Sequence, residues 1–132
     1  QWKAHNVEEG VGYATLTDII YQAWAGLTAR EYKHLKGLRQ ENLRDNMTNI
    51  ELALNTLAEV ATTEYSRQSN PQTMEENKRV AREGGSVARE ARETMEKRLG
   101  RSVVSKERAL DYILDTSKKD KKGELPFDDE NK

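Results

Sequence analysis

The chain has 132 residues, of which 34% are charged and 35% hydrophobic, and its formal net charge is −1. A chain of this length favours one domain, and this balance favours a soluble helical protein with a modest core. The absence of cysteine excludes disulfides, thiolate catalysis and cysteine-ligated zinc. No apolar run approaches the ~18 residues that a membrane span needs, and no signal peptide is visible. We therefore expect a cytoplasmic protein of bacterial type.

The first part of the chain predicts a loosely packed polar lead-in, residues 1–15, followed by three short helices. The first two helices begin after a threonine that can cap them, and Gly26 and Gly37 stand where each of them ends. The expected short helices cover residues 18–25, 29–36 and 39–46.

The most apolar helical pattern spans residues 48–67 and predicts the central helix of the fold. Thr48 and Glu51 have the spacing of a capping box, in which each side chain binds the backbone amide of the other residue. One apolar stripe, at steps of three and four residues, predicts the side of this helix that meets the core. The stripe consists of Ile50, Leu54, Leu57, Ala61 and Tyr65.

A long helix is predicted over residues 73–99, between a break at Pro71 and a stop at Gly100. Two glycines interrupt it, at a cost of roughly 1 kcal/mol each relative to alanine. Gly84 falls on the apolar stripe of this helix, so we expect a neighbouring helix to approach closely there. Gly85 lies about 100° around the helix and is expected to tolerate alanine.

The C-terminal part predicts one more helix, residues 106–115, with Ala109, Leu110, Ile113 and Leu114 facing the core. Residues 116–132 hold too few apolar side chains to order themselves, and we expect them to be disordered. The predicted fold is therefore all-α, with about six helices in a single domain, residues 1–115, around the central helix.

Residues 28–46 are the candidate binding segment. Within residues 28–44, five Lys or Arg stand against two Glu. Two short helices around a glycine turn suggest a helix-turn-helix, whose second helix reads DNA. The candidate contacts to phosphates and base edges are Arg30, Lys33, Lys36, Arg39, Gln40, Asn42 and Arg44. Lys33 stands where that motif usually has an alanine, and a basic helix pair is also an ordinary solvated surface, so a scaffold or protein-binding role stays open.

Nothing in the sequence predicts catalysis. Its two histidines, His5 and His34, lie in no metal-binding or nucleophile motif, and no phosphate loop or dinucleotide fingerprint occurs. We therefore predict no catalytic residue, no cofactor, no metal site and no small-molecule substrate.

A resemblance to a known family rests on two runs, G-L-T-A-R-E-Y-K-H-L-K-G-L at residues 26–38 and L-R-D-N-M-T-N-I-E-L-A-L-N-T-L-A-E-V-A-T-T-E at residues 43–64. These runs resemble the C-terminal region of the DNA-damage-inducible protein D family, which is allied to phage-type antirepressors with an N-terminal Bro domain. Residues 70–92 and 99–106 resemble it as well.

The resemblance implies a non-enzymatic protein of the bacterial SOS response that modulates DNA repair or recombination through protein or DNA contacts. It implies RecA recombinase filaments as a partner, and an upstream Bro-type domain that precedes Gln1 and is absent from this chain. Two other classes stay open: a phage-type antirepressor that binds DNA through residues 28–46, and a helical dimerisation module that forms a homo-oligomer.

Overall fold

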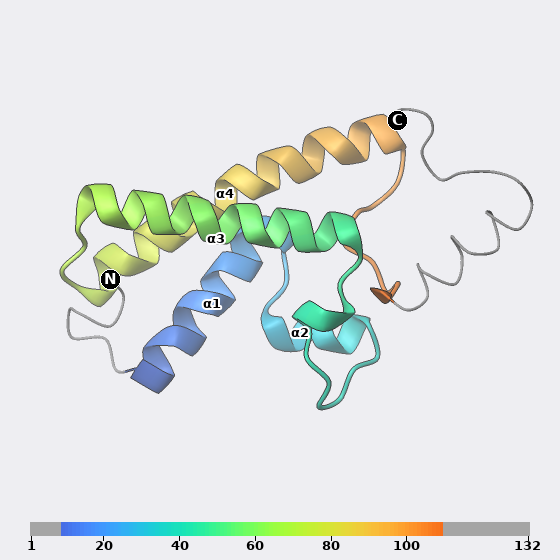
Figure 1. Ribbon diagram of the computed structural model, residues 1–132, viewed down its shortest axis with the longest axis horizontal. Coiled ribbons are helices and arrows are strands. Elements are labelled where there is room, and N and C mark those ends of the chain that lie inside the picture. The colour runs from blue at the N-terminus through green and yellow to red at the C-terminus, as the bar shows by residue number, and fades with distance from the viewer. Residues whose placement is uncertain (1–8, 110–132) are drawn as a thin grey trace, which may run out of the picture.

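The computed structural model describes residues 9–109, most of which are helical (Figure 1). The α-helices are α1 (Glu9–Ala25), α2 (Ala29–Leu35), α3 (Asn49–Ser69) and α4 (Met74–Leu99), with a 3-10 turn, η2, at Arg44–Asn46. No strand occurs in this range, so the all-α class is confirmed. Of the six or so helices expected, four α-helices lie within residues 9–109. The predicted helix 106–115 begins too early, because residues 106–108 are not helical, and its positions from 110 onward lie outside the described residues. The predicted disordered tail lies wholly outside them.

The two longest helices, α3 and α4, form an antiparallel pair joined by a short turn at residues 70–73 (Figure 1). α4 packs against both α3 and α1. The short α2 contacts α1 and lies below α3 in the view of Figure 1. The predicted ranges of the central and long helices, 48–67 and 73–99, agree with α3 and α4 to within two residues.

Hydrogen bonds at the helix ends explain this agreement. The capping box predicted at the start of α3 is formed, and the threonine cap predicted at the start of α2 is a full capping box of Thr28 and Glu31. At the start of α4, the Thr73 hydroxyl accepts a hydrogen bond from the Glu76 amide, and the Glu76 carboxylate accepts one from the Gln72 amide. α4 ends at Gly100, whose left-handed conformation (φ 73°) favours glycine.

The predicted loose lead-in is wrong in its second half, because α1 reaches back to Glu9 and residues 9–15 are helical. Leu16, in the next turn, is fully buried in the core. The helix therefore begins nine residues before residue 18, where the sequence predicted its start.

The predicted helix 39–46 is also wrong, since only the single turn η2 forms there. Short-range polar contacts explain the difference. The Asn42 side-chain oxygen accepts a hydrogen bond from the Asp45 amide at 2.9 Å, and the Glu41 carboxylate accepts one from the Arg39 amide at 2.7 Å. Bonds of this kind offer the backbone an alternative to the helical ladder.

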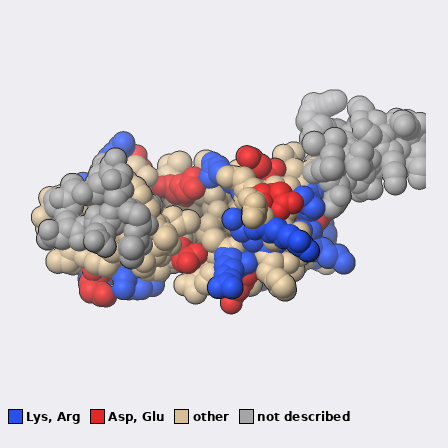
Figure 2. Space-filling model, turned by 90° about the horizontal axis from the view of Figure 1, so that it is seen from below, with Lys and Arg blue, Asp and Glu red and all other residues tan. Residues whose placement is uncertain are grey.

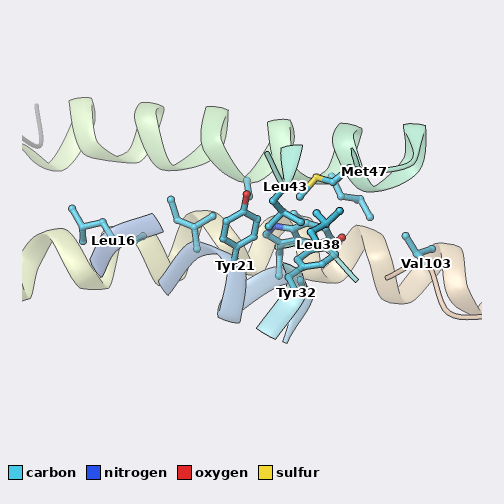
Figure 3. Close-up of a cluster of buried hydrophobic side chains, with 14 residues drawn as sticks. Leu16, Tyr21, Tyr32, Leu38, Leu43, Met47 and Val103 are labelled. Atoms are coloured by element: carbon cyan, nitrogen blue, oxygen red, sulfur yellow. The ribbon is translucent and has the colours of Figure 1, made fainter. Parts of the chain in front are cut away.

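The hydrophobic core gathers side chains from all four helices and from the segments after α2 and α4 (Figure 3). Trp24 and Tyr32 lie at its centre, fully buried, with ring centroids 6.1 Å apart in an edge-to-face arrangement. The Trp24 indole N–H donates to Asn55 Oδ1 of α3 at 3.1 Å. α1, α2 and α3 thus meet at one aromatic cluster.

α3 turns a different side to the core from the one that its apolar stripe predicted. Leu54 is buried as expected, but Leu57 is 37% exposed and Ile50 and Ala61 are only partly buried. Tyr65 is exposed as well. The buried positions of α3 are mostly polar or small, and they are Glu51, Leu54, Asn55, Ala58, Thr62 and Ser66.

The close approach of α4 explains this rotation of α3. Gly84 of α4 faces Thr62, and a Cβ on Gly84 would lie 2.7 Å from both the Cα and the backbone nitrogen of Thr62. Only small side chains fit where two backbones come this close. The predicted close approach at Gly84 is therefore confirmed, and the larger side chains of α3 point elsewhere.

The expectation for Gly85 is wrong, because α1 covers it. A Cβ on Gly85 would overlap the Ala23 methyl group and would lie 3.1 Å from the Ile20 carbonyl oxygen. The two glycines therefore let α4 approach two different helices, α3 through Gly84 and α1 through Gly85.

We predict that Gly84→Ala and Gly85→Ala each destabilise the fold. Overpacking of this kind commonly costs ~1–3 kcal/mol, which outweighs the gain of up to ~1 kcal/mol in helix propensity. Urea unfolding should show a lower midpoint for both variants. Thr94→Ala, at an exposed position of the same helix, is the control and should leave the midpoint unchanged or raise it. A raised midpoint for Gly84→Ala would contradict the close packing.

Candidate interaction surfaces

The seven residues predicted to contact nucleic acid do not all lie on the surface. Lys36 is only 3% exposed and Lys33 is half-buried. Figure 2 shows Lys and Arg side chains over the region of α2, with Asp and Glu among them. The exposed members of the set are Arg30, Arg39, Gln40, Asn42 and Arg44.

Lys36 is a buried structural residue, so its predicted phosphate contact is wrong. Its ammonium nitrogen lies 2.7 Å from Glu51 Oε1. The same nitrogen donates to the carbonyl oxygens of Ser105, at 2.8 Å, and Glu107. An ammonium group has three donors, and these three acceptors use them all. A lysine in this position binds the protein's own backbone and carboxylate, and no donor is left for a phosphate.

Glu51 is the fully buried partner of Lys36 and joins three separate parts of the chain. Its carboxylate accepts hydrogen bonds from the Tyr32 hydroxyl at 2.7 Å, the Thr48 amide at 2.9 Å and the Ser105 amide at 3.1 Å. Burial, and then the adjacent Glu51 charge, raise the pKa of the Tyr32 phenol far above its usual range. The Tyr32 hydroxyl therefore stays protonated and donates to Glu51.

Residues 28–46 do not form the predicted helix-turn-helix. α2 is followed by irregular chain and the three-residue turn η2, so the segment has no second helix that could enter a DNA groove. Arg44 forms an exposed ion pair with Glu59, with 2.9 Å between the charged atoms. The interpretation of this segment as a DNA-reading helix pair is therefore wrong for the described structure.

A different surface, on α3, carries exposed apolar side chains. Ile50, Ala53, Leu57 and Val60 follow one another at steps of three, four and three residues, so they lie along one side of the helix; we call this set the outer face of α3. Val60 is 53% exposed and Leu57 37%, Ala53 is exposed, and Ile50 is partly buried. The outer face lies opposite the buried positions of α3.

The apolar stripe of α3 was visible in the sequence, but it was interpreted as the side of the helix that faces the core. α3 has an apolar side and a more polar side, and an apolar stripe ordinarily faces the core. The polar side carries Glu51, Asn55, Thr62 and Ser66, all of which are buried. Only the positions of Lys36, Trp24 and Gly84, from other parts of the chain, make the polar side the better fit to the interior.

Residues 9–109 offer no cluster of metal ligands, since no group of three or more His, Asp or Glu side chains there is placed to hold an ion. None of the helices in this range is both long enough and apolar enough to cross a membrane.

No family model, no curated protein and no solved structure matches this chain. The resemblance of residues 26–38 and 43–64 to a known family therefore stays a prediction.

We predict that Glu51→Leu destabilises the protein by about 3–5 kcal/mol, because it leaves the Lys36 charge buried without its partner. The double variant Glu51→Leu with Lys36→Met removes both charges and should recover much of that loss. Urea unfolding measures both. Arg44→Ala breaks an exposed ion pair and serves as the control, with an expected cost of about 0–1 kcal/mol. Equal losses for the single and double variants would contradict this account of the pair.

We also predict that stability falls as the pH rises above 10. The folded-state pKa of Tyr32 is raised above the ordinary value of 10.0, so the folded protein holds this proton more tightly than the unfolded chain does. The stabilisation is fully present below pH 10 and is lost progressively above it. Tyr32→Phe should show a weaker loss than the parent as the pH rises above about 10, measured as the urea midpoint. Parallel pH profiles for the two proteins would refute the assignment.

Proposed function

We propose that this chain is a non-enzymatic helical module that binds another protein through the outer face of α3. One observation carries the proposal: α3 exposes Leu57 and Val60 while it buries Glu51 and Asn55. Single exposed apolar residues are ordinary on protein surfaces, but contiguous ones mark interaction sites. The outer face is contiguous, since its four side chains follow one helical stripe.

The spacing of the outer face suits a helical partner. Positions three and four residues apart are the anchors by which amphipathic helices and apolar grooves recognise each other. Full burial of a leucine or valine side chain yields about 1.5–3 kcal/mol relative to full exposure. Leu57 and Val60 are already partly covered, so each gains less than this. A contact of this strength is reversible rather than permanent.

The surroundings of the outer face have the composition of an interface rim. Thr56, Glu59 and Glu64 are exposed beside the stripe, and a polar rim around an apolar centre is the usual anatomy of a protein–protein contact. Glu59 is held by Arg44, which fixes the charge on this side of the stripe.

The partner that the family resemblance supports is a bacterial protein of DNA repair or recombination, and RecA recombinase is the first to test. In this proposal the module acts in the cytoplasm during the SOS response. DNA itself is a weaker candidate, because Lys36 and Arg44 are engaged within the protein and no recognition helix follows α2. A second copy of the chain is the remaining candidate, and it would use the same outer face.

Leu57→Asp with Val60→Asp should abolish binding of the fluorescently labelled chain to RecA filaments, measured by anisotropy. A carboxylate buried in an apolar contact without a partner is strongly unfavourable. The melting temperature should stay near that of the parent, because both side chains are exposed. Unchanged binding by this variant would exclude the outer face.

Leu35→Asp and Leu99→Asp are matched controls, since these leucines are 41% and 46% exposed on other helices. Both should bind as the parent does. Sedimentation of the parent and the α3 variant, without RecA, identifies the case in which the partner is a second copy. Titration with oligonucleotides alone should give a flat trace at ~100 mM salt, because the exposed Lys and Arg side chains are interspersed with Asp and Glu and the net charge is −1.

A further inference from the structure

The described chain ends beside the start of the outer face of α3. After α4, residues 101–108 return to the N-terminal end of α3 (Figure 1). Val103 is buried in the core, and the Ser105 amide donates to the Glu51 carboxylate. Ile50, the first residue of the outer face, lines a hollow of about 30 Å³ together with Val103 and Ser105.

Partly buried hydrogen bonds hold the end of the described chain in place. The Lys36 ammonium group holds the carbonyl oxygens of Ser105 and Glu107. The Arg108 guanidinium lies 3.4 Å from Asn46 Oδ1, just before α3 begins. The residues that follow therefore start within a short distance of Ile50.

Those residues carry an apolar stripe of their own. Leu110, Ile113 and Leu114 stand at positions i, i+3 and i+4, which is the spacing of one side of a helix. Asp111 and Asp115 fall on the other side. A helix this short has no stability in water by itself, so such a sequence needs an apolar surface to fold against.

We propose that residues 110–114 pack onto the outer face of α3, with their three apolar side chains against the stripe that begins at Ile50. The segment is short enough to lie along this stripe, since five helical residues rise about 7.5 Å and the seven-residue step from Ile50 to Leu57 rises about 10.5 Å. Because the segment and the outer face belong to one chain, the effective concentration of the segment near this face is of roughly millimolar order.

Tethering favours this occupant over a second copy of the chain. A stable interface between two proteins buries about 1,200–2,000 Å², and a stripe of four side chains on one helix is small for that purpose. A segment of the same chain loses no translational freedom when it docks, so a small apolar contact suffices. Any protein that binds the outer face must then displace residues 110–114. This consequence rests on the proposed function, whereas the contact itself does not.

A spin label tests the contact directly. Because the chain has no cysteine, Asp115→Cys takes a single nitroxide on the polar side of the segment. The amide NMR signals of Ala53, Leu57 and Val60 should lose most of their intensity and regain it when the nitroxide is reduced. Adding Leu110→Asp and Ile113→Asp should restore the signals. Leu125→Asp, a matched change outside the segment, should leave the loss intact.

Two results would overturn the contact: full intensity in the labelled parent, or an equal loss when the spin label and the ¹⁵N label are on different molecules, which would identify a second copy. RecA binding is measured separately, so failure of the proposed function is distinguishable from failure of the contact. If both hold, Leu110→Asp with Ile113→Asp should bind RecA filaments severalfold more tightly than the parent. Unchanged affinity would overturn the competition for the outer face.

Discussion

The buried carboxylate of Glu51 holds together parts of the chain that are far apart in sequence. It accepts hydrogen bonds from Tyr32 of α2, from Thr48 at the start of α3 and from Ser105 after α4, and it pairs with Lys36. Taking two charges out of water costs several kcal/mol per ion. That cost is offset only when all of these donors are in place, so none of the segments can shift without the others.

A second constraint acts halfway along α3, where Gly84 brings α4 against Thr62. Backbones this close leave no room for Leu, Val or Tyr side chains between them. Small and polar residues therefore occupy the inner side of α3, and the larger apolar residues are left on the outer face. The exposed stripe is thus a consequence of how closely two helices pack, since the same residues would otherwise have met the core.

These two constraints also make the outer face a suitable platform for binding. α3 is held at its first turn by Glu51 and near its middle by the contact with α4, so its exposed side chains keep their positions before any partner arrives. Less conformational entropy is then lost on binding. The same fixed geometry brings the end of the described chain next to Ile50.

The sequence by itself determined where α3 and α4 begin and end, because those boundaries depend on local bonds: a threonine and a glutamate three residues apart at the start, and a left-handed glycine at the end of α4. It also determined the all-helical class and the close approach at Gly84.

Only the tertiary structure decided which side of α3 is buried. The answer depends on how near α4 lies to α3, and on where Trp24 and Lys36 are placed to bind Asn55 and Glu51. The burial of Lys36 was also decided only by the tertiary structure. Its partner Glu51 lies on another helix, and its carbonyl acceptors lie some seventy residues away along the chain. Residues 39–46 do not form a helix because polar side chains accept hydrogen bonds from nearby backbone amides in place of helical carbonyl oxygens. The periodicity of apolar residues does not reveal this competition.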